Sequence, residues 1–478
     1  MSGQLHNYVD GAFAPAKGSG SIEVLDPASG NVVGAVPDSN GDAVDAAVAG
    51  ARRAQKDWGR RPPVERAAFL RKIAAGIRAR TDELARAVVQ EQGKVLGLAV
   101  GEVNFAADYL DYMAEWARRI EGEIITSDRP GENIFLFRQP IGVVAGILPW
   151  NFPFFLIARK LGPALVTGNT IVIKPSEETP LSANLFARIA QESELPAGVF
   201  NLVHGRGAST GAALSAHPDI GMISFTGSVA TGSKIMSLAA RNITKVNLEL
   251  GGKAPVIVMA DADLEPTVNA IKAGRLLNAG QTCNCPERIY VQRPVAERFL
   301  EMLSSTMKAA TYGHPLSPDG VDMGPLVSAG HAGKVAGMVE RAISAGARLV
   351  TGGRAVVKEG GHYFEPTVLT GCRQDMEIVQ EEVFGPVLPV DAFDTLDEAI
   401  ERANDCRYGL TSSIYTTNVS TAMRASRDLK FGETYVNREH FEAMQGFHAG
   451  TRQSGIGGAD GKHGLYENTV HHVVYLQS

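Results

Sequence analysis

The chain has 478 residues, of which 44% are hydrophobic and 21% are charged. This length is more than one hydrophobic core normally serves, so two or three domains are expected. The balance of 46 basic and 52 acidic residues gives a net charge of -6. A negatively charged chain has little attraction for a phosphate backbone, so we expect no nucleic-acid partner.

The cysteine content and the hydropathy pattern bear on the compartment. Four cysteines occur: Cys283, Cys285, Cys372 and Cys406. They are too sparse and too irregularly spaced for a disulfide framework or a zinc site, so we expect a reducing cytoplasm and no metal. The most apolar run, residues 141–158, is interrupted by Pro149, Asn151 and Pro153, which argues against contact with a membrane.

The first 140 residues combine short strands with a group of helices. Strands are expected at residues 8–13 and 22–36, and helices at 42–58, 63–80, 81–92 and 96–121. Residues 122–139 are typical of a hairpin around a Pro130-Gly131 turn. A strand is also expected at residues 471–476, so the hairpin and this strand are candidates for an assembly arm.

Strands and helices alternate from residue 141 onward. Strands are expected at 141–148, 170–174, 200–203, 222–225 and 245–248, with helices at 154–166, after Pro180, near 210–216 and at 231–240. This order predicts an α/β fold with a parallel, doubly wound sheet. A second α/β domain is predicted after Cys283 by strands at 288–291 and 348–350, helices at 295–310 and 330–345, and a helix and a strand within 392–415.

Such a sheet binds its ligand beyond the carboxyl ends of its strands, although the dinucleotide fingerprint G-x-G-x-x-G is missing here. Lys174 and Glu177 follow the second strand, where they could hold the ribose hydroxyls of an adenosine. The Glu177 carboxylate would repel a 2′-phosphate, which favours NAD over NADP. Gly-bearing turns at residues 205–211 and 225–232 suit a phosphate, or else ordinary strand-to-helix packing.

Two side chains are candidates for covalent chemistry. Cys283 lies in the polar segment of residues 278–287, so we interpret it as a nucleophile rather than a small buried hydrophobe. Cys285, two residues on, is either a bystander or a rival. Glu249 ends a predicted strand and precedes two glycines, so it is either a mobile general base or an ordinary surface glutamate.

The chain resembles the NAD(P)-dependent aldehyde dehydrogenases in six motifs, which are Pro149-Trp150-Asn151-Phe152-Pro153, Lys174-Pro175-Ser176-Glu177, Phe225-Thr226-Gly227-Ser228, Leu248-Glu249-Leu250-Gly251-Gly252-Lys253, Gly280-Gln281-Thr282-Cys283 and Glu381-Glu382-Val383-Phe384-Gly385-Pro386. Residues 151–160 and 441–450 are similar to the lactaldehyde dehydrogenases within that family. The resemblance implies a Rossmann-like NAD-binding domain (1–118 and 138–248), an α/β catalytic domain (249–445) and a small β oligomerisation arm (119–137 and 462–478).

The resemblance also implies a role for each matching residue. Cys283 would attack the aldehyde carbon, the Asn151 amide and the Cys283 N–H would hold the oxyanion, and Glu249 would activate the water that hydrolyses the thioester. The residues implied for NAD binding are Trp150, Lys174, Glu177, Gly207, Thr226, Ser228, Glu382 and Phe384. A homodimer or homotetramer that acts on a small-molecule aldehyde is expected.

One segment departs from the pattern of many relatives, because Gly446-Phe447-His448-Ala449-Gly450 stands where they carry Pro-Phe-Gly-Gly. His448, with Arg159, Asn284 and Glu442, would add polar groups to the substrate tunnel, which favours a short, hydroxylated aldehyde of the lactaldehyde or glycolaldehyde type. Arg159 and Glu442 could instead only pair with each other.

Three other functions stay open. In a semialdehyde dehydrogenase, Arg159 or Arg452 would bind a distal carboxylate. The chain could also be a thioester hydrolase that does not use NAD, or a non-catalytic protein that keeps the same fold.

Overall fold

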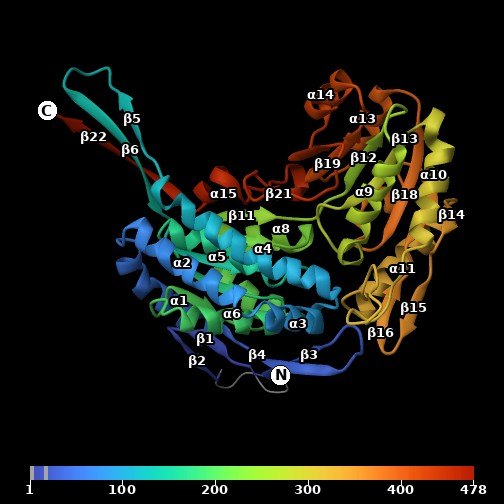
Figure 1. Cartoon of the computed structure of the whole chain (residues 1–478). Coiled ribbons are helices and arrows are strands. Elements are labelled where there is room, and N and C mark those ends of the chain that lie inside the picture. The colour runs from blue at the N-terminus through green and yellow to red at the C-terminus, as the bar shows by residue number, and fades with distance from the viewer. Residues whose placement is uncertain (1–4, 16–19) are drawn as a thin grey trace.

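The computed structural model describes residues 5–15 and 20–478. It contains two large β-sheets, each covered by helices, and a three-stranded arm that projects away from the rest of the molecule (Figure 1). The first sheet is built from strands before residue 250 together with β21 (Gly455–Ile456), and the second from strands between residues 254 and 436. Within the described residues, no helix combines the length and the apolar character needed to cross a membrane.

The first sheet has eight strands, in the spatial order β2 (Ala12–Ala14), β1 (Asn7–Val9), β9 (Phe200–Leu202), β8 (Thr170–Lys174), β7 (Val143–Ile147), β10 (Met222–Thr226), β11 (Lys245–Glu249) and β21 (Gly455–Ile456). The five strands from β9 to β11 are parallel, as the alternating pattern predicted. Every residue of β7 and β8 is buried, because helices cover both faces of the sheet.

Both edges of this sheet differ from a purely parallel arrangement. The hairpin of β1 and β2 pairs antiparallel with β9, and β21 pairs antiparallel with β11. The alternation of strands and helices between residues 141 and 248 does not indicate that segments far away in the sequence pair with the two edges of the sheet. The consequence for the site is that residues near 455 lie beside the end of β11.

The helices around the first sheet are α1 (Gly41–Trp58), α2 (Pro63–Arg78), α3 (Thr81–Gln92), α4 (Leu96–Glu115), η1 (Trp116–Arg118), α5 (Phe155–Val166), α6 (Leu181–Glu192), η2 (Gly207–Gly211), α7 (Ala212–Ala216), α8 (Val229–Ala239) and η3 (Ala240–Asn242). A hairpin of β3 (Gly20–Leu25) and β4 (Val32–Asp38) lies outside the sheet. Pro63 occupies the first turn of α2, where the backbone N–H that proline lacks would have no hydrogen-bond partner within the helix. Apolar faces of α2, α4 and α5 form one buried core with the sheet.

The second sheet has seven strands, in the order β14 (Arg348–Thr351), β17 (Thr367–Thr370), β18 (Val387–Phe393), β13 (Pro286–Gln292), β12 (Ala254–Val258), β19 (Thr411–Tyr415) and β20 (Glu433–Val436). Only β14 is antiparallel to its neighbour. The surrounding elements are α9 (Leu264–Leu276), η4 (Leu277–Gly280), α10 (Arg293–Lys308), α11 (Ala329–Ser344), α12 (Glu377–Gln380), α13 (Leu396–Asn404), α14 (Val419–Asp428) and the hairpin of β15 (Ala355–Lys358) and β16 (Gly361–Phe364). The sequence did not predict β12 and α9.

The arm consists of β5 (Glu123–Thr126), β6 (Glu132–Pro140) and β22 (Thr469–Gln477). The predicted hairpin is present, and β22 pairs antiparallel with β6 along its whole length within the same chain. The segment before β22 contains η5 (Arg452–Ser454) and α15 (Gly461–Glu467). Figure 1 shows the arm standing clear of both sheets.

Candidate active site

Three residues that the motifs singled out meet at one cavity of about 220 Å³. Asn151 follows β7, Glu249 ends β11, and Cys283 lies between η4 and β13, and all three line the cavity. They come from three separate parts of the chain. Their convergence places a thiol, a carboxylate and an amide around one enclosed space.

The segment before Cys283 has an unusual backbone. Asn278, Ala279 and Gly280 are all left-handed, with φ of 49°, 57° and 75°. The two non-glycine residues are strained and persist only where their surroundings hold them. The Asn278 amide donates to the Asn151 carbonyl at 3.1 Å, and the Gln281 side chain accepts from the Val327 N–H at 2.9 Å. These bonds fix the turn that presents Cys283.

His448 connects the thiol to a second carboxylate. Two backbone hydrogen bonds with Ala459 hold its main chain, and its ring Nδ1 lies 2.5 Å from Glu433 Oε1. Burial and the Arg159 charge lower the pKa of His448, but its interactions with Cys283 and Glu433 outweigh them and raise it well above its usual value. At neutral pH the ring is therefore an imidazolium, whose charge lowers the pKa of the Cys283 thiol, although burial is the larger effect and leaves that pKa above its usual value. The ring thus favours the thiolate by its charge and does not accept the thiol proton.

Glu249 has the properties of a general base. Its side chain is buried, neither carboxylate oxygen has a hydrogen-bond partner, and Oε2 lies 3.6 Å from His448 Nε2. Burial raises the pKa of Glu249 to about 7, although the charges of His448, Arg159 and Lys160 lower it. A carboxylate with this pKa can accept a proton from water near neutral pH.

The Asn151 amide faces the same cavity. Its Nδ2 donates one hydrogen bond to the Gln281 carbonyl at 3.1 Å, which leaves its second hydrogen for another acceptor. The Asn151 backbone carbonyl accepts from the buried Lys94 ammonium at 2.7 Å. The amide is thus held in place with one donor to spare, as an oxyanion site requires.

Cys285 differs from Cys283 in its surroundings. Its thiol is buried, donates to the Thr282 carbonyl at 3.0 Å and lies 3.1 Å from the Arg275 guanidinium. Burial raises the pKa of Cys285 to about 12 despite the nearby Arg275 charge. At neutral pH it stays a neutral thiol, which is a poor nucleophile.

A second cavity, of about 230 Å³, adjoins the other side of Cys283. Besides Cys283 and Asn151, its lining includes five of the residues expected to bind NAD: Trp150, Thr226, Ser228, Glu382 and Phe384. The Phe384 ring stands edge-on to the Trp150 ring with centroids 5.4 Å apart. Ser228 caps the N-terminus of α8. The lining therefore fits a dinucleotide whose reactive end reaches the thiol.

The other three expected cofactor residues form a cluster at the ends of β8 and β9. Lys174 Nζ lies 3.1 Å from Glu177 Oε2, and the Gly207 N–H donates to Glu177 Oε1 at 3.1 Å. In a parallel sheet these strand ends share one edge with those of β7 and β10, which precede Trp150 and Thr226. Six of the eight residues thus end or follow strands of the first sheet at this edge, while Glu382 and Phe384 precede β18 of the second sheet and reach the second cavity from there.

Comparison with known proteins gives one consistent result. The profile of the Aldehyde dehydrogenase family matches residues 13–474. The chain belongs to the aldehyde dehydrogenase family. It is 58% identical over 472 residues to a lactaldehyde dehydrogenase of Escherichia coli (strain K12), covering 98% of each chain, and 44% identical over 462 residues to a 3,6-anhydro-alpha-L-galactose dehydrogenase of Vibrio sp. (strain EJY3), covering 96% of each. A crystal structure of lactaldehyde dehydrogenase from Escherichia coli superposes with a TM-score of 0.99 at 57% identity, covering 100% of both chains.

The four residues expected to contact substrate in this aldehyde dehydrogenase all line the first cavity: Arg159, Asn284, Glu442 and His448. Arg159 Nη1 lies 3.5 Å from Glu442 Oε1, and Nε donates to Asp460 Oδ1 at 3.0 Å. The pairing of Arg159 with Glu442 that we considered is therefore present. The motifs did not indicate Asp460, whose carboxylate together with that of Glu442 balances the positive charge of Arg159.

Several residues of this site were not found from the sequence. The cavity wall opposite its polar groups includes Phe105, Phe155 and Phe441. Glu433, the partner of His448, starts β20 with no local signal that could have revealed it. Lys160 could have been identified from the sequence, because a lysine in an apolar and therefore buried segment needs hydrogen-bond partners for its ammonium group inside the protein. Its Nζ donates to Ser224 and Thr226 at 3.1 and 3.0 Å.

Proposed function

We propose that this aldehyde dehydrogenase uses NAD to oxidise a short, hydroxylated aldehyde of the lactaldehyde or glycolaldehyde type to its carboxylic acid. The observation that carries the proposal is the cavity beside Cys283, which is small and presents Asn284, Glu442 and His448. A buried polar wall penalises an alkyl chain that leaves it without partners and favours a hydroxyl group. The likeness to the lactaldehyde dehydrogenase of Escherichia coli supports the same substrate class.

The proposed mechanism assigns one task to each catalytic side chain. The Cys283 thiolate, favoured by the His448 charge, forms a bond to the aldehyde carbon after the thiol loses its proton to solvent, and the free Asn151 N–H stabilises the oxyanion. NAD, when bound, supplies the hydride acceptor. Glu249 then removes a proton from the water that attacks the thioester, and the carboxylic acid leaves as the Cys283 sulfur is released.

The surroundings of the arginines argue against a semialdehyde as substrate. Asp460 and Glu442 already compensate the charge of Arg159. Arg452 donates to the backbone carbonyls of Asn404 and Cys406 and does not line the cavity. A semialdehyde would therefore bring its distal carboxylate into a site that already contains the Glu442 carboxylate, and like charges at close range repel.

A panel of four aldehydes tests the proposed substrate class by NADH absorbance. We expect lactaldehyde and glycolaldehyde to exceed propanal and succinic semialdehyde in kcat/KM by about tenfold or more, which corresponds to roughly 1.4 kcal/mol. A tenfold preference for succinic semialdehyde would contradict the proposal. If no aldehyde produced NADH while a thioester was hydrolysed, the protein would be an NAD-independent hydrolase.

The position of Glu177 predicts the choice of cofactor. Its carboxylate is held by Lys174 and by the Gly207 N–H, where we place the adenosine ribose, so it repels a 2′-phosphate. We expect Glu177→Gln to raise kcat/KM with NADP about tenfold relative to NAD. Glu178→Gln, which removes the adjacent carboxylate, is the control and should leave the ratio unchanged. An unaltered ratio in both variants would show that Glu177 does not face the ribose.

We also propose the domain division that the family resemblance implied. Residues 1–118 and 138–248 would form the NAD-binding domain, 249–445 the catalytic domain, and 119–137 with 462–478 the arm. Residues 1–4 and 16–19 of the first range lie outside the described residues. The division is supported by four buried apolar clusters, two built mainly on the first sheet and two on the second, and by the separate three-stranded sheet.

The arm and the thiols support two further proposals. Exposed apolar side chains gather on the arm: Ile124, Ile125, Phe137, Val470, Val473, Tyr475 and Leu476. Such a surface suits burial against another copy of the chain, so we propose a homodimer or homotetramer.

All four cysteines are free thiols, which supports a cytoplasmic location.

A further inference from the structure

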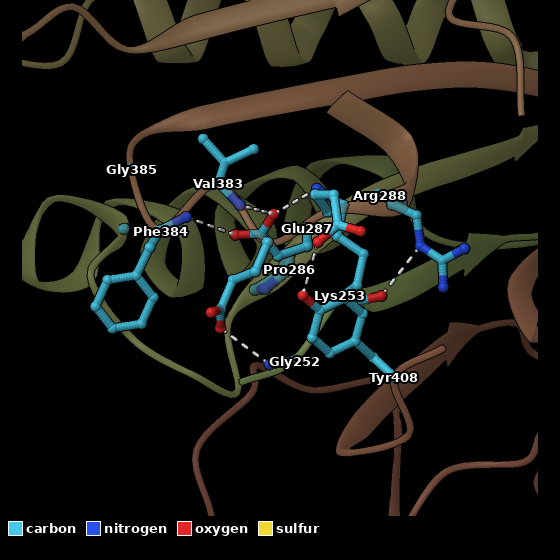
Figure 2. A network of polar contacts seen from close by, with 12 residues as sticks. Gly252, Lys253, Pro286, Glu287, Arg288, Val383, Phe384, Gly385 and Tyr408 are labelled. Carbon is cyan, nitrogen blue, oxygen red and sulfur yellow. Dashed lines mark hydrogen bonds and ion pairs between the residues drawn. The ribbon is translucent and has the colours of Figure 1, made fainter. Parts of the chain in front are cut away.

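A buried carboxylate outside both cavities connects the segment that carries Cys283 to the loop that would bind the cofactor. Glu287 is the second residue of β13, four residues after Cys283, and its side chain is 1% exposed. Figure 2 shows its carboxylate between Lys253 and the backbone of Val383 and Phe384. It accepts from Lys253 Nζ at 2.7 Å, Arg275 Nη1 at 2.7 Å, the Val383 N–H at 3.2 Å and the Phe384 N–H at 3.3 Å.

Phe384 needs such a restraint because its backbone is strained. Its φ is +57°, in the left-handed region that a bulky aromatic residue rarely adopts. Glu287 holds its N–H, and a ring nitrogen of His331 lies 2.7 Å from its carbonyl oxygen. The ring packs edge-on against Trp150. The conformation that turns the Phe384 ring toward the cavity is therefore maintained from both sides of the residue.

Arg275 extends the same connection. Its Nη1 donates to the Pro286 carbonyl at 2.8 Å as well as to Glu287, and its second amino group donates to the Gly385 carbonyl. The neighbouring Glu382 accepts from the Gly252 N–H at 2.9 Å. The loop of residues 382–385 is thus tied to α9, to the start of β13 and to the glycine pair after Glu249.

We propose that Glu287 is a positioning residue that holds Val383 and Phe384, and through them the Glu382 side chain, in the geometry that receives the nicotinamide end of the cofactor. The inference rests on the proposed function, in which Glu382 and Phe384 contact the cofactor. Glu287 itself lines neither cavity. It acts through the loop and touches no reacting atom.

The charge of Glu287 is essential to this role. Burial raises the pKa of Glu287, but the Arg275 and Lys253 charges outweigh it and lower the pKa to about 2. The carboxylate therefore stays ionised and accepts all four hydrogen bonds at once. A neutral amide offers only one oxygen as acceptor and leaves two buried cations without a counterion.

Hydrogen exchange at the two backbone amides tests the proposal without relying on turnover. The variants are Glu287→Gln and the milder Glu287→Asp, which keeps the counterion for Lys253 and Arg275 but withdraws it from the amides. We expect exchange in the peptide containing Val383 and Phe384 to accelerate at least tenfold, and the dissociation constant for NAD to rise about five- to tenfold. The KM for aldehyde should change less than twofold.

The chain contains a matched control in Glu91. Its carboxyl group is fully buried, which raises its pKa to about 8, and it also accepts from two successive backbone amides, those of Leu181 and Ser182, far from residues 382–385 in sequence. Glu91→Gln should accelerate exchange at those two amides only and leave NAD binding within twofold of wild type. An equal loss of NAD affinity in Glu91→Gln would mean that general destabilisation explains the effect.

The possible results separate the inference from the proposed function. Unchanged hydrogen exchange at Val383 and Phe384 in both Glu287 variants would show that Glu287 does not restrain the loop. Faster exchange with unchanged NAD affinity, in a protein whose wild type binds NAD, would overturn its link to the cofactor. If the wild type failed to bind NAD, the proposed function would fail, while the exchange data would still decide whether Glu287 holds the loop.

Discussion

Replacing Cys283 by alanine is expected to reduce aldehyde oxidation by about 10⁴-fold or more, or roughly 5 kcal/mol of transition-state stabilisation. The Cys283 thiol lines both cavities, and a thiolate is a far stronger nucleophile than the Thr226 hydroxyl, which also lines both. Without it, the Asn151 amide and the cofactor site have no covalent intermediate to act on. NADH formation at saturating aldehyde measures turnover, and intact-protein mass spectrometry shows whether an acyl adduct still forms.

Cys285→Ala is the matched control, because it removes a thiol only two residues away. The Cys285 thiol is buried behind the segment and its pKa is raised to about 12, so turnover should stay within about threefold of wild type. Arg275 keeps its bonds to Glu287 and Pro286 in this variant. Full activity in Cys283→Ala together with loss in Cys285→Ala would reverse the assignment of the nucleophile.

The second large effect is expected for Glu249→Gln, which should slow hydrolysis of the acyl-enzyme by about 10²- to 10⁴-fold. The amide cannot accept a proton from water, whereas attack by Cys283 does not require the Glu249 carboxylate. The acyl adduct on Cys283 should therefore accumulate and be visible by mass spectrometry. Rapid formation of one equivalent of NADH per site, followed by slow turnover, would report the same block.

The pH dependence of this step follows from the raised pKa of Glu249. The base acts only when ionised, so acyl-enzyme hydrolysis in the wild type should increase with pH up to about 7 and level off above it. The increase should be absent in Glu249→Gln. Burial and the Glu287 charge also raise the pKa of Glu382 to about 7, so decay of the isolated acyl-enzyme without cofactor is the decisive measurement.

Glu442→Gln provides a control within the same cavity. Glu442 lines the space next to Cys283 but is engaged by Arg159 and Asn284. Its replacement should raise the KM for a hydroxyaldehyde and leave the acyl-enzyme short-lived. If Glu442→Gln accumulated the adduct and Glu249→Gln did not, Glu442 would be the general base.

The local elements of the fold could be predicted because periodicity and turn residues determine them. The apolar strands at 143–147 and 170–174 and the helix that starts at Pro63 are where the pattern placed them. Pairing between distant segments could not be derived from local patterns, since the partners of β21 and β22 lie hundreds of residues away. The strand at 471–476 could be grouped with the hairpin at 122–139 as an arm, but its pairing with β6 could not be derived. The turn at 278–280 shows a second limit, because nothing local to Ala279 indicates a left-handed backbone.

Residues of the site could be predicted from the sequence where they occur in contiguous motifs. Asn151, Glu249 and Cys283 each stand in such a motif, and the structure brings them to one cavity. Glu433 and Asp460 contribute through partners chosen by the tertiary fold, so the sequence around them carries no signal. The neutralisation of Arg159 by two acids could be recognised only once the chain was folded.

The late position of β21, β22 and His448 in the chain has a consequence for biosynthesis. The ribosome completes Cys283, Asn151 and Glu249 long before it makes the segment that covers β11 and supplies the imidazole. Gln477 in β22 bonds to the carbonyl of Pro130, 347 residues earlier. A nascent chain therefore carries its thiol without the His448 charge until residue 448 has been made, and the third strand of the arm forms only after residues 469–477 follow. We expect catalytic competence and the complete arm to appear only after both segments have been synthesised.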